Sequence, residues 1–360
     1  MKNISYLVLF IFIFLACEKD KNTEPIIIEK DETPYTFSYQ TLPQPNLPLD
    51  NPLTVQGVEL GRMLFYDPIL SKDARQSCAS CHIQNKGFSD PSRFSIGVNE
   101  IRGNRQAMPV FNLAWHSNDF FWDGRASTLR EQSLEPIQDP LEMNETLENV
   151  ISKLNGIEAY TNQFSLAFGT PDITAQRMGL AMEQFMLSIV SSDSKYDRYL
   201  AGEVELTESE ERGKQLFETE YNPFFPQFSG ADCAHCHGGS NFENDQYMNN
   251  GLDTDDMMTD IGREAVTQNP MDKGKFKVPS LRNIELTAPY MHDGRFQTLE
   301  EVIDHYNEGI KMSSTADPTV INTMESGLFL TDQDKVDLIN FLKTLTDESL
   351  ATHPAYQSPF

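Results

Sequence analysis

Two five-residue motifs in the sequence pair cysteines with a histidine: Cys78-Ala-Ser-Cys-His82 and Cys233-Ala-His-Cys-His237. Cysteines three apart on a helical turn can form thioethers to both vinyl groups of one haem, and the histidine that follows places its imidazole under the iron. A zinc site made from both pairs, or a dithiol redox centre, is disfavoured by two intact motifs in a cysteine-poor chain. The motifs therefore predict two covalently bound haem c groups, with His82 and His237 as iron ligands and His235 at the surface.

This interpretation accounts for all five cysteines of the chain. Four of them attach the haems and leave none for a disulfide: Cys78, Cys81, Cys233 and Cys236. The fifth, Cys17, follows an apolar run from Ile4 to Ala16 and resembles a lipobox cysteine, so residues 1–17 are expected to be a signal peptide. The alternative is ordinary cleavage near Ala16 with Cys17 left free. We expect an exported, periplasmic or cell-envelope lipoprotein whose only membrane contact is the lipid on Cys17.

The charge of the chain restricts its partners. Acidic residues outnumber basic ones by 54 to 28, which gives a formal net charge of −26. This charge repels nucleic acids and anionic lipid surfaces, so nucleic acid is excluded as a partner. The same charge would attract a basic electron donor such as a small cytochrome c or a cupredoxin, although a general effect on solubility is the simpler explanation.

Apolar residues at helical spacing dominate the chain beyond residue 52, and strand-like alternation is scarce. Residues 18–52 are instead polar and proline-rich, which predicts a tether. A capping box, Thr207-x-x-Glu210, marks the start of a helix that opens a second domain. We expect a mainly α fold with long loops, in which four segments form helices: Val58–Phe65, Thr174–Val190, Glu208–Phe217 and Asp332–Leu345.

Two blocks of sequence recur in each half of the chain and reveal an internal duplication. The first block precedes each haem motif, as Gly61-Arg-Met-Leu-Phe65 and as Gly213-Lys-Gln-Leu-Phe217. The second block follows each motif, as Pro109-Val-Phe-Asn-Leu113 with Asp123-Gly-Arg-Ala-Ser-Thr-Leu129, and as Pro279-Ser-Leu-Arg-Asn283 with Asp293-Gly-Arg-Phe-Gln-Thr-Leu299. We expect two cytochrome c-like haem domains, at residues 53–205 and 206–346, and a tail at 347–360.

With Phe121-Trp-Asp-Gly-Arg125 and Pro289-Tyr-Met-His-Asp-Gly-Arg295 added to the haem motifs, residues 53–346 resemble the bacterial di-haem cytochrome c peroxidases and the related MauG enzymes. In that family the N-terminal haem reacts with hydrogen peroxide, the C-terminal haem receives electrons, and a tryptophan matched by Trp122 lies between them. Glu142 falls where the family has an acid–base carboxylate that transfers a proton between the peroxide oxygens, and Gln132 where it has a pocket glutamine. On composition alone, Trp122 would be interpreted as a buried core residue and Glu142 as a solvated surface residue.

The duplication also allows the second axial positions of the two haems to be compared. Pro136 lies 13 residues after Asp123 and cannot bind iron, whereas Tyr306 lies 13 residues after Asp293 and can. MauG resembles this chain in having an axial tyrosine here, which implies that Tyr306 is an iron ligand of the C-terminal haem. The alternative is a half-buried residue on the amphipathic segment Leu299–Tyr306, and three rival ligands remain: His305, Met291 and Met312.

The resemblance implies a calcium ion between the haems, held partly by backbone oxygens. Thr287 and Pro289 match two of the family's carbonyl donors. The usual asparagine donor is missing from the frame Arg105-Gln106, which puts calcium in doubt, although Gln106 could still offer an oxygen.

Many di-haem peroxidases rest with a histidine from a loop bound to the N-terminal haem, but this loop reads Ser95-Ile-Gly-Val-Asn99, with Val98 in the matching position. We therefore expect that haem to be open in the oxidised protein unless Met108 or His116 replaces the missing ligand. The sequence favours a peroxidase that reduces hydrogen peroxide to water with electrons from a soluble donor. A MauG-like oxidase of a protein substrate and a non-catalytic di-haem electron carrier are the alternatives, and a homodimer stays open. Glu142 and the ligand-free Pro136 argue against the carrier.

Overall fold

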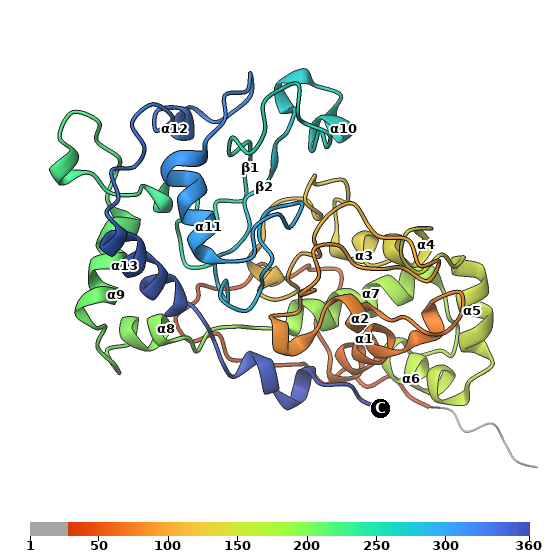
Figure 1. Ribbon diagram of the computed structural model, residues 1–360. Coiled ribbons are helices and arrows are strands. Elements are labelled where there is room, and N and C mark those ends of the chain that lie inside the picture. Colours follow the sequence, from red (N-terminus) through yellow and green to blue (C-terminus); the bar gives the residue numbers. More distant parts are fainter. Residues whose placement is uncertain (1–27) are drawn as a thin grey trace, which may run out of the picture.

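The computed structural model describes residues 28–360, so the predicted signal peptide and Cys17 lie outside the described residues. Two bodies of helices and long loops lie side by side (Figure 1). The helices of the first half are α1 Val55–Tyr66, α2 Cys78–Cys81, α3 Leu129–Gln132, α4 Glu135–Gln138, α5 Leu147–Asn155, α6 Glu158–Phe168 and α7 Ala175–Ser188. Those of the second half are α8 Lys195–Leu200, α9 Glu208–Glu218, α10 Glu264–Thr267, α11 Leu299–Asp304, α12 Pro318–Ile321 and α13 Asp332–Lys343.

The mainly α fold is confirmed, and the sheet content of the described chain is one antiparallel pair, β1 Tyr247–Met248 with β2 Phe276–Lys277. All four predicted helices are present as α1, α7, α9 and α13. The capping box is also present, since Thr207 accepts a hydrogen bond from the backbone N–H of Glu210 and the Glu210 side chain accepts one from the N–H of Thr207. No helix among residues 28–360 has the length and apolar character needed to span a membrane.

The duplication appears as two equivalent helix pairs, α1 on α7 and α9 on α13. A Cβ atom on Gly61 would overlap the carbonyl oxygen of Ala181, and one on Gly213 would overlap that of Asp337. Each repeated glycine therefore lets two helices approach closely. The phenylalanine four residues later packs equivalently in each pair, with ring centroids 5.3 Å apart for Phe65–Phe185 and 5.2 Å apart for Phe217–Phe341.

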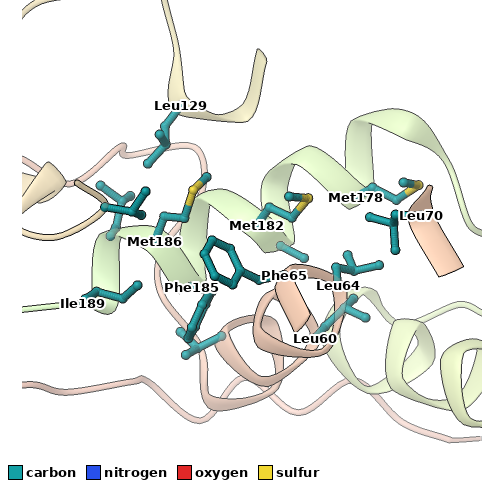
Figure 2. Close-up of a cluster of buried hydrophobic side chains, with 14 of the residues drawn as sticks. Leu60, Leu64, Phe65, Leu70, Leu129, Met178, Met182, Phe185, Met186 and Ile189 are labelled. Atoms are coloured by element: carbon teal, nitrogen blue, oxygen red, sulfur yellow. The ribbon is translucent and has the colours of Figure 1, made fainter. Parts of the chain in front are cut away.

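The core of the first domain lies along the contact between α1 and α7. Apolar side chains spaced three and four apart on each helix face one another there (Figure 2). Leu60, Leu64 and Phe65 come from α1, and Met178, Met182 and Phe185 from α7. The chain leads from the end of α1 at this contact to the first haem motif in α2.

The predicted tether is wrong for the part that the structure describes. Residues 28–52 form no helix, but Leu42 is buried and Tyr35 and Phe37 pack against the core of the first domain. Backbone hydrogen bonds from Tyr35 to Leu53 and from Val55 to Thr33 fix the segment alongside the start of α1. The proline-rich composition prevents regular structure here, but the interspersed aromatic residues bury enough apolar surface to hold the segment in place.

The predicted tail at residues 347–360 also belongs to the first domain. Leu350 and Tyr356 are buried in the first core, and the Tyr356 hydroxyl accepts a hydrogen bond from the backbone N–H of Val190. The chain thus returns across the molecule after α13, as the dark blue segment of Figure 1 shows. The predicted boundary between the two domains lies between residues 205 and 206. The helix before it, α8, already packs with the second core, since the Tyr196 ring lies edge-on to Phe341 with centroids 5.4 Å apart.

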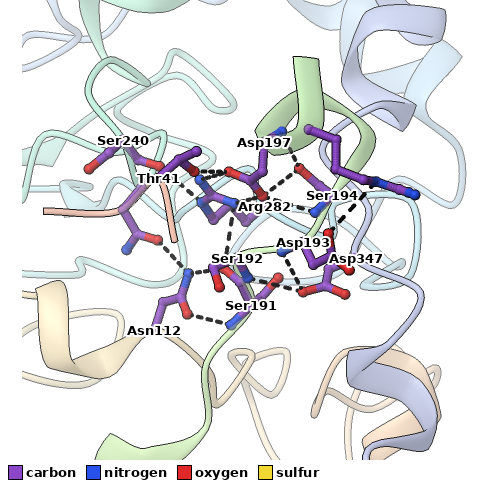
Figure 3. A network of polar contacts seen from close by, with 12 residues as sticks. Thr41, Asn112, Ser191, Ser192, Asp193, Ser194, Asp197, Ser240, Arg282 and Asp347 are labelled. Carbon is purple, nitrogen blue, oxygen red and sulfur yellow. Dashed lines mark hydrogen bonds and ion pairs between the residues drawn. The ribbon is translucent and has the colours of Figure 1, made fainter. Parts of the chain in front are cut away.

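A buried polar network joins the two domains at the segment between α7 and α8 (Figure 3). Arg282 donates two hydrogen bonds of 2.8 Å to Asp197, and both side chains are buried. Asn112 and Asn283 both donate hydrogen bonds to Ser191, and both have left-handed backbone conformations. They are therefore equivalent, although Asn112 lies three residues after the repeated proline of its block and Asn283 lies four residues after its own. Contacts between the domains extend this network, since the Thr41 hydroxyl donates to Asp197 at 2.8 Å and Asn112 Nδ2 donates to Asn241 Oδ1 at 3.1 Å.

Candidate active site

The first haem motif opens onto a large cavity in the first domain, which we call cavity 1. Its volume is about 900 Å³, and both Cys81 and His82 line it. The motif forms the short helix α2, and His82 follows as its C-terminal cap. The Nδ1 atom of His82 lies 3.0 Å from the carbonyl oxygen of Phe88, which fixes Nδ1 as the donor and leaves Nε2 as a free lone pair.

The second motif lines a separate cavity, cavity 2, in the second domain. Cys233, Cys236 and His237 all face it. The Nδ1 atom of His237 lies 3.1 Å from the carbonyl oxygen of Pro279, which is the counterpart of the contact made by His82. Burial lowers the pKa of His237 to about 4, so its imidazole is neutral at pH 7, as an iron ligand must be.

These donor sets fit haem c in both domains. The four motif cysteines are free thiols, with none spent on a disulfide. Cavity 1 is lined by Cys81 of the first motif, whereas Cys78 packs against the first core, and cavity 2 is lined by both cysteines of the second motif. In each cavity the motif histidine has its Nδ1 already committed to a backbone carbonyl, the arrangement that directs Nε2 to iron. His235, by contrast, is exposed on the surface, as predicted.

Glu142 lies in cavity 1 together with Gln132, Pro136 and Arg125. Burial, and to a smaller extent the negative charge of Asp139, raise the pKa of Glu142 to about 7 against the opposing positive charge of Arg125. A carboxyl group with this pKa can accept and return a proton near neutral pH. The family resemblance predicted Glu142 and Gln132 beside the N-terminal haem, and the internal duplication predicted Pro136 at its second axial position; all three line cavity 1.

The loop that lacks the usual histidine packs beside Glu142. Val98 donates its backbone N–H to the carbonyl oxygen of Glu142 at 2.8 Å, and a side chain on Gly97 would overlap the carbonyl oxygen of Leu141. The loop therefore holds the backbone of Glu142 in place. Of the histidines in the described chain, only His82 and His116 line cavity 1.

Tyr306 lines cavity 2, whereas two of its three rivals do not. The Tyr306 hydroxyl accepts a hydrogen bond from Asn250 Nδ2 at 3.2 Å, and burial raises its pKa to about 12 despite that hydrogen bond. His305 faces the carbonyl oxygen of Asn250 and lies outside the cavity lining, as does the exposed Met312. Met291 does line the cavity. A π-helical turn, His305–Gly309, interrupts the predicted amphipathic helix after Asp304 and turns Tyr306 inward.

Trp122 lies in the wall between the two cavities, since it lines both of them. The indole N–H donates to the carbonyl oxygen of Gln106 at 2.8 Å, and the Trp122 carbonyl accepts from the backbone N–H of Lys277 at 2.7 Å. Gln106 in turn donates its backbone N–H to the carbonyl oxygen of His292 in the second domain. The indole is thus buried and held by both domains.

The three candidate calcium donors all line cavity 2. Gln106 also lines cavity 1, whereas Thr287 and Pro289, which match the family's carbonyl donors, line cavity 2 alone. The Gln106 amide nitrogen donates to the carbonyl oxygen of Asp90 at 3.2 Å, which orients its amide group. Calcium bound by these residues stays a prediction.

Two side chains of the site have roles that the sequence did not reveal. Arg125 stacks on the Phe121 ring, with the guanidinium carbon 3.4 Å from the ring centroid, and it also binds Asp123 and Glu135. Its place in the repeated Asp-Gly-Arg motif was a usable signal. Asn250 contacts both the Tyr306 hydroxyl and the Met291 sulfur, at 3.2 and 3.3 Å, but it lies 56 and 41 residues from them in sequence and belongs to no local motif.

Comparison with known proteins agrees with this geometry. The family described as di-haem cytochrome c peroxidase matches residues 55–205, and the cytochrome c family matches residues 210–346. The methylamine utilization protein MauG of Methylophilus methylotrophus is 34% identical over 305 residues, which cover 84% of this chain and 86% of that protein. Cytochrome c551 peroxidase of Nitrosomonas europaea is 37% identical over 249 residues, covering 68% of this chain and 71% of that protein.

A solved structure shows the same arrangement. The crystal structure of a MauG-like protein associated with microbial copper homeostasis has a TM-score of 0.79 and 35% sequence identity, covering 90% of this chain and 98% of that one. Relatives named as peroxidases and relatives named MauG thus both match, which indicates a peroxidase-type oxidoreductase without distinguishing the two activities. The chain belongs to the di-haem cytochrome c peroxidase and MauG family, and it carries two covalently bound haem c groups.

Proposed function

We propose that this protein is a peroxidase that reduces hydrogen peroxide to water in the first domain, with electrons that a soluble donor delivers to the second. The observation that carries the proposal is the buried carboxyl group of Glu142, with its pKa near 7, in the cavity that also holds His82. An electron carrier needs no proton-transferring group beside its iron, so this carboxyl group argues against a simple carrier.

The residues of cavity 1 divide the work of proton transfer. The haem supplies the redox chemistry that cleaves the O–O bond. Glu142 accepts the proton from one oxygen of hydrogen peroxide and delivers it to the other, so that water can leave. Gln132 offers an amide that can hydrogen-bond the peroxide, and Arg125, fixed on the Phe121 ring, stabilises negative charge that develops in the cavity.

The pKa of Glu142 makes the reaction with peroxide depend on pH. Only the deprotonated carboxylate can accept a proton, and its fraction rises as the pH rises through the folded pKa of about 7. We expect kcat/KM for peroxide to increase between about pH 6 and pH 8 and then to level off. A pH profile of wild type and Glu142→Gln checks this: the acid limb should be missing in the variant, and an identical limb in both would assign it to another group.

The loop around Val98 predicts that the oxidised protein reacts with peroxide without prior reduction. This loop contributes no imidazole, and His116 Nδ1 is engaged by carboxylates of the second domain. We expect a high-spin N-terminal haem and an immediate reaction when oxidised protein is mixed with peroxide in a stopped-flow instrument. An all-low-spin spectrum together with a lag that only prereduction removes would contradict the proposal.

Exposed aromatic residues just before the second haem motif support entry of electrons through the second domain. Phe224, Phe225 and Phe228 are 84%, 56% and 70% exposed and lie a few residues before Cys233. Exposed aromatic residues in an acidic protein suit transient contact with a basic donor, because charge guides the encounter and apolar contact fixes it. From there, Trp122 is placed to connect cavity 2 with cavity 1. The predicted signal peptide supports export to the periplasm or cell envelope as the setting for this donor.

A MauG-like oxidase is the second candidate, and Tyr306 is the observation that favours it. Tyr306 lines cavity 2 together with His237, which supports the axial tyrosine that the resemblance to MauG implies. In that case the protein would remove electrons from a protein substrate instead of accepting them from a donor. The two candidates differ in whether a reduced donor is consumed in proportion to peroxide.

A further inference from the structure

A histidine and two carboxylates from different domains meet outside both haem motifs. His116 follows the turn Leu113–Trp115 of the first domain, and Glu243 and Asp245 lie in the loop before β1 of the second. The His116 Nδ1 atom is 3.1 Å from Glu243 Oε2 and 3.3 Å from Asp245 Oδ1. One ligand atom from each residue lies within 4.8 Å of the other two, the only such group of three among the described residues.

The hydrogen bonds of this cluster leave one oxygen without a proton. His116 Nδ1 carries at most one hydrogen, which Asp245 Oδ1 can accept. The Glu243 side chain is only 4% exposed, and its Oε2 atom is buried without a hydrogen-bond partner among the described residues. A buried carboxylate oxygen in this situation is costly unless a cation neutralises it. One metal ion could be shared by all three atoms, whereas one hydrogen cannot.

The outer oxygens of both carboxylates are already held by other groups. Asn241 donates to Glu243 Oε1 at 2.6 Å. The Ser117 hydroxyl and backbone N–H donate to Asp245 Oδ2 at 2.6 and 3.1 Å. Each carboxylate is therefore oriented with its second oxygen toward His116, as supporting contacts orient the ligands of protein metal sites.

We propose that His116, Glu243 and Asp245 bind one divalent transition-metal ion, with zinc as the best-suited probe. One imidazole nitrogen and two carboxylate oxygens are a donor set that zinc accepts, and ligand atoms that share zinc at about 2.0–2.2 Å in tetrahedral geometry lie about 3.3–3.6 Å apart. The distances from His116 Nδ1 to the two oxygens, 3.1 and 3.3 Å, are close to the lower end of that range. Water can complete the coordination, because the Asp245 side chain is 19% exposed.

Lys277 is the natural competitor of the metal ion. Its ammonium group is buried without a hydrogen-bond partner among the described residues, and its charge acts on both Glu243 and Asp245. This positive charge partly neutralises the carboxylates in the metal-free protein and repels an incoming cation. The Lys277→Met variant should therefore bind zinc at least as tightly as wild type. Because it changes the same interface without removing a proposed ligand, it distinguishes the loss of a zinc ligand from general damage to the interface.

A metal ion at this position would join the two domains and control His116. Its ligands come from both domains, so binding stabilises their docked arrangement. His116 also lines cavity 1 and is one of the residues that could replace the missing haem ligand. With Nδ1 bound to metal, the imidazole is held at the interface and stays away from the N-terminal haem.

The test is zinc titration of the full-length protein with both haems attached, after treatment with a chelator. Isothermal calorimetry should show one tight site in wild type and in the exposed control Glu325→Gln, and at least tenfold weaker binding in Glu243→Gln. Zinc should raise the melting temperature of wild type but not that of Glu243→Gln. Equal affinity in wild type and Glu243→Gln, or equal losses in Glu243→Gln and Lys277→Met, would overturn the proposal.

A crystal of the wild-type protein soaked in zinc makes the test independent of any variant. An anomalous peak at the zinc edge is expected between His116 Nδ1, Glu243 Oε2 and Asp245 Oδ1. Zinc peaks confined to other acidic surfaces would rule this site out.

Discussion

Glutamine in place of Glu142 is expected to lower peroxide turnover by a factor on the order of a hundred or more while both haems stay attached. The amide keeps the size of the side chain but cannot accept and return a proton. Because the other residues of cavity 1 do not change, the loss should appear in the reaction with peroxide and not in the binding of haem. Steady-state turnover, with haem content measured by the pyridine haemochrome assay, checks the prediction.

Glu148→Gln is the matched control for this substitution. Glu148 is exposed in the first turn of α5, outside the lining of cavity 1, so its replacement removes the same charge without touching the cavity. Turnover should stay close to the wild-type value. If Glu142→Gln behaved in the same way, Glu142 would have no part in the mechanism.

Phenylalanine in place of Tyr306 is expected to change the absorption spectrum of the C-terminal haem and to shift its reduction potential by on the order of a hundred millivolts. An axial ligand is the strongest control that the protein has over iron, and the substitution removes only the oxygen atom that Asn250 contacts in cavity 2. The N-terminal haem should keep its spectrum and serves as the internal reference. A spectroelectrochemical titration measures both haems in one sample.

Tyr221→Phe and Met291→Leu are the comparisons that interpret this result. Tyr221 also lines cavity 2, but its hydroxyl contacts Ser326, so its loss should leave both haem spectra unchanged. Met291 is the rival that remains in the cavity lining. A spectral change in Met291→Leu, with none in Tyr306→Phe, would assign the ligand to Met291.

The sequence was sufficient where chemistry or repetition leaves a local signal. The Cys-x-x-Cys-His motifs predicted two haem sites, and the histidine of each motif lines a cavity of its own. The repeated Gly-x-x-Leu-Phe block predicted an internal duplication, which appears as the helix pairs α1 on α7 and α9 on α13. The family resemblance brought Glu142, Gln132 and Trp122 to one cavity, because the spacing between short motifs is maintained by the fold. Their roles in catalysis remain predictions that the variants above test.

The sequence was insufficient where long-range contacts decide the structure. Proline and polar residues in the segment before α1 concealed the few aromatic residues that pack it onto the first domain, and nothing local showed that Tyr356 returns to the same core. Asn250 and Glu243 have no motif, because their partners are distant in sequence. Tyr306 reaches Asn250 through the folding of the second domain, and His116 reaches Glu243 only where the two domains dock. Such contacts depend on tertiary packing, which residue spacing does not encode.

The measurement that tests the central claim most directly is the oxidation of a reduced small cytochrome c by hydrogen peroxide in the presence of this protein. Peroxide takes up two electrons and two protons to give two waters, so a peroxidase should oxidise about two molecules of cytochrome for each molecule of peroxide consumed. We predict this ratio over many turnovers for wild type, and greatly slowed turnover in Glu142→Gln. Peroxide consumption with no oxidation of the donor, or no turnover at all in protein that contains both haems, would contradict the account.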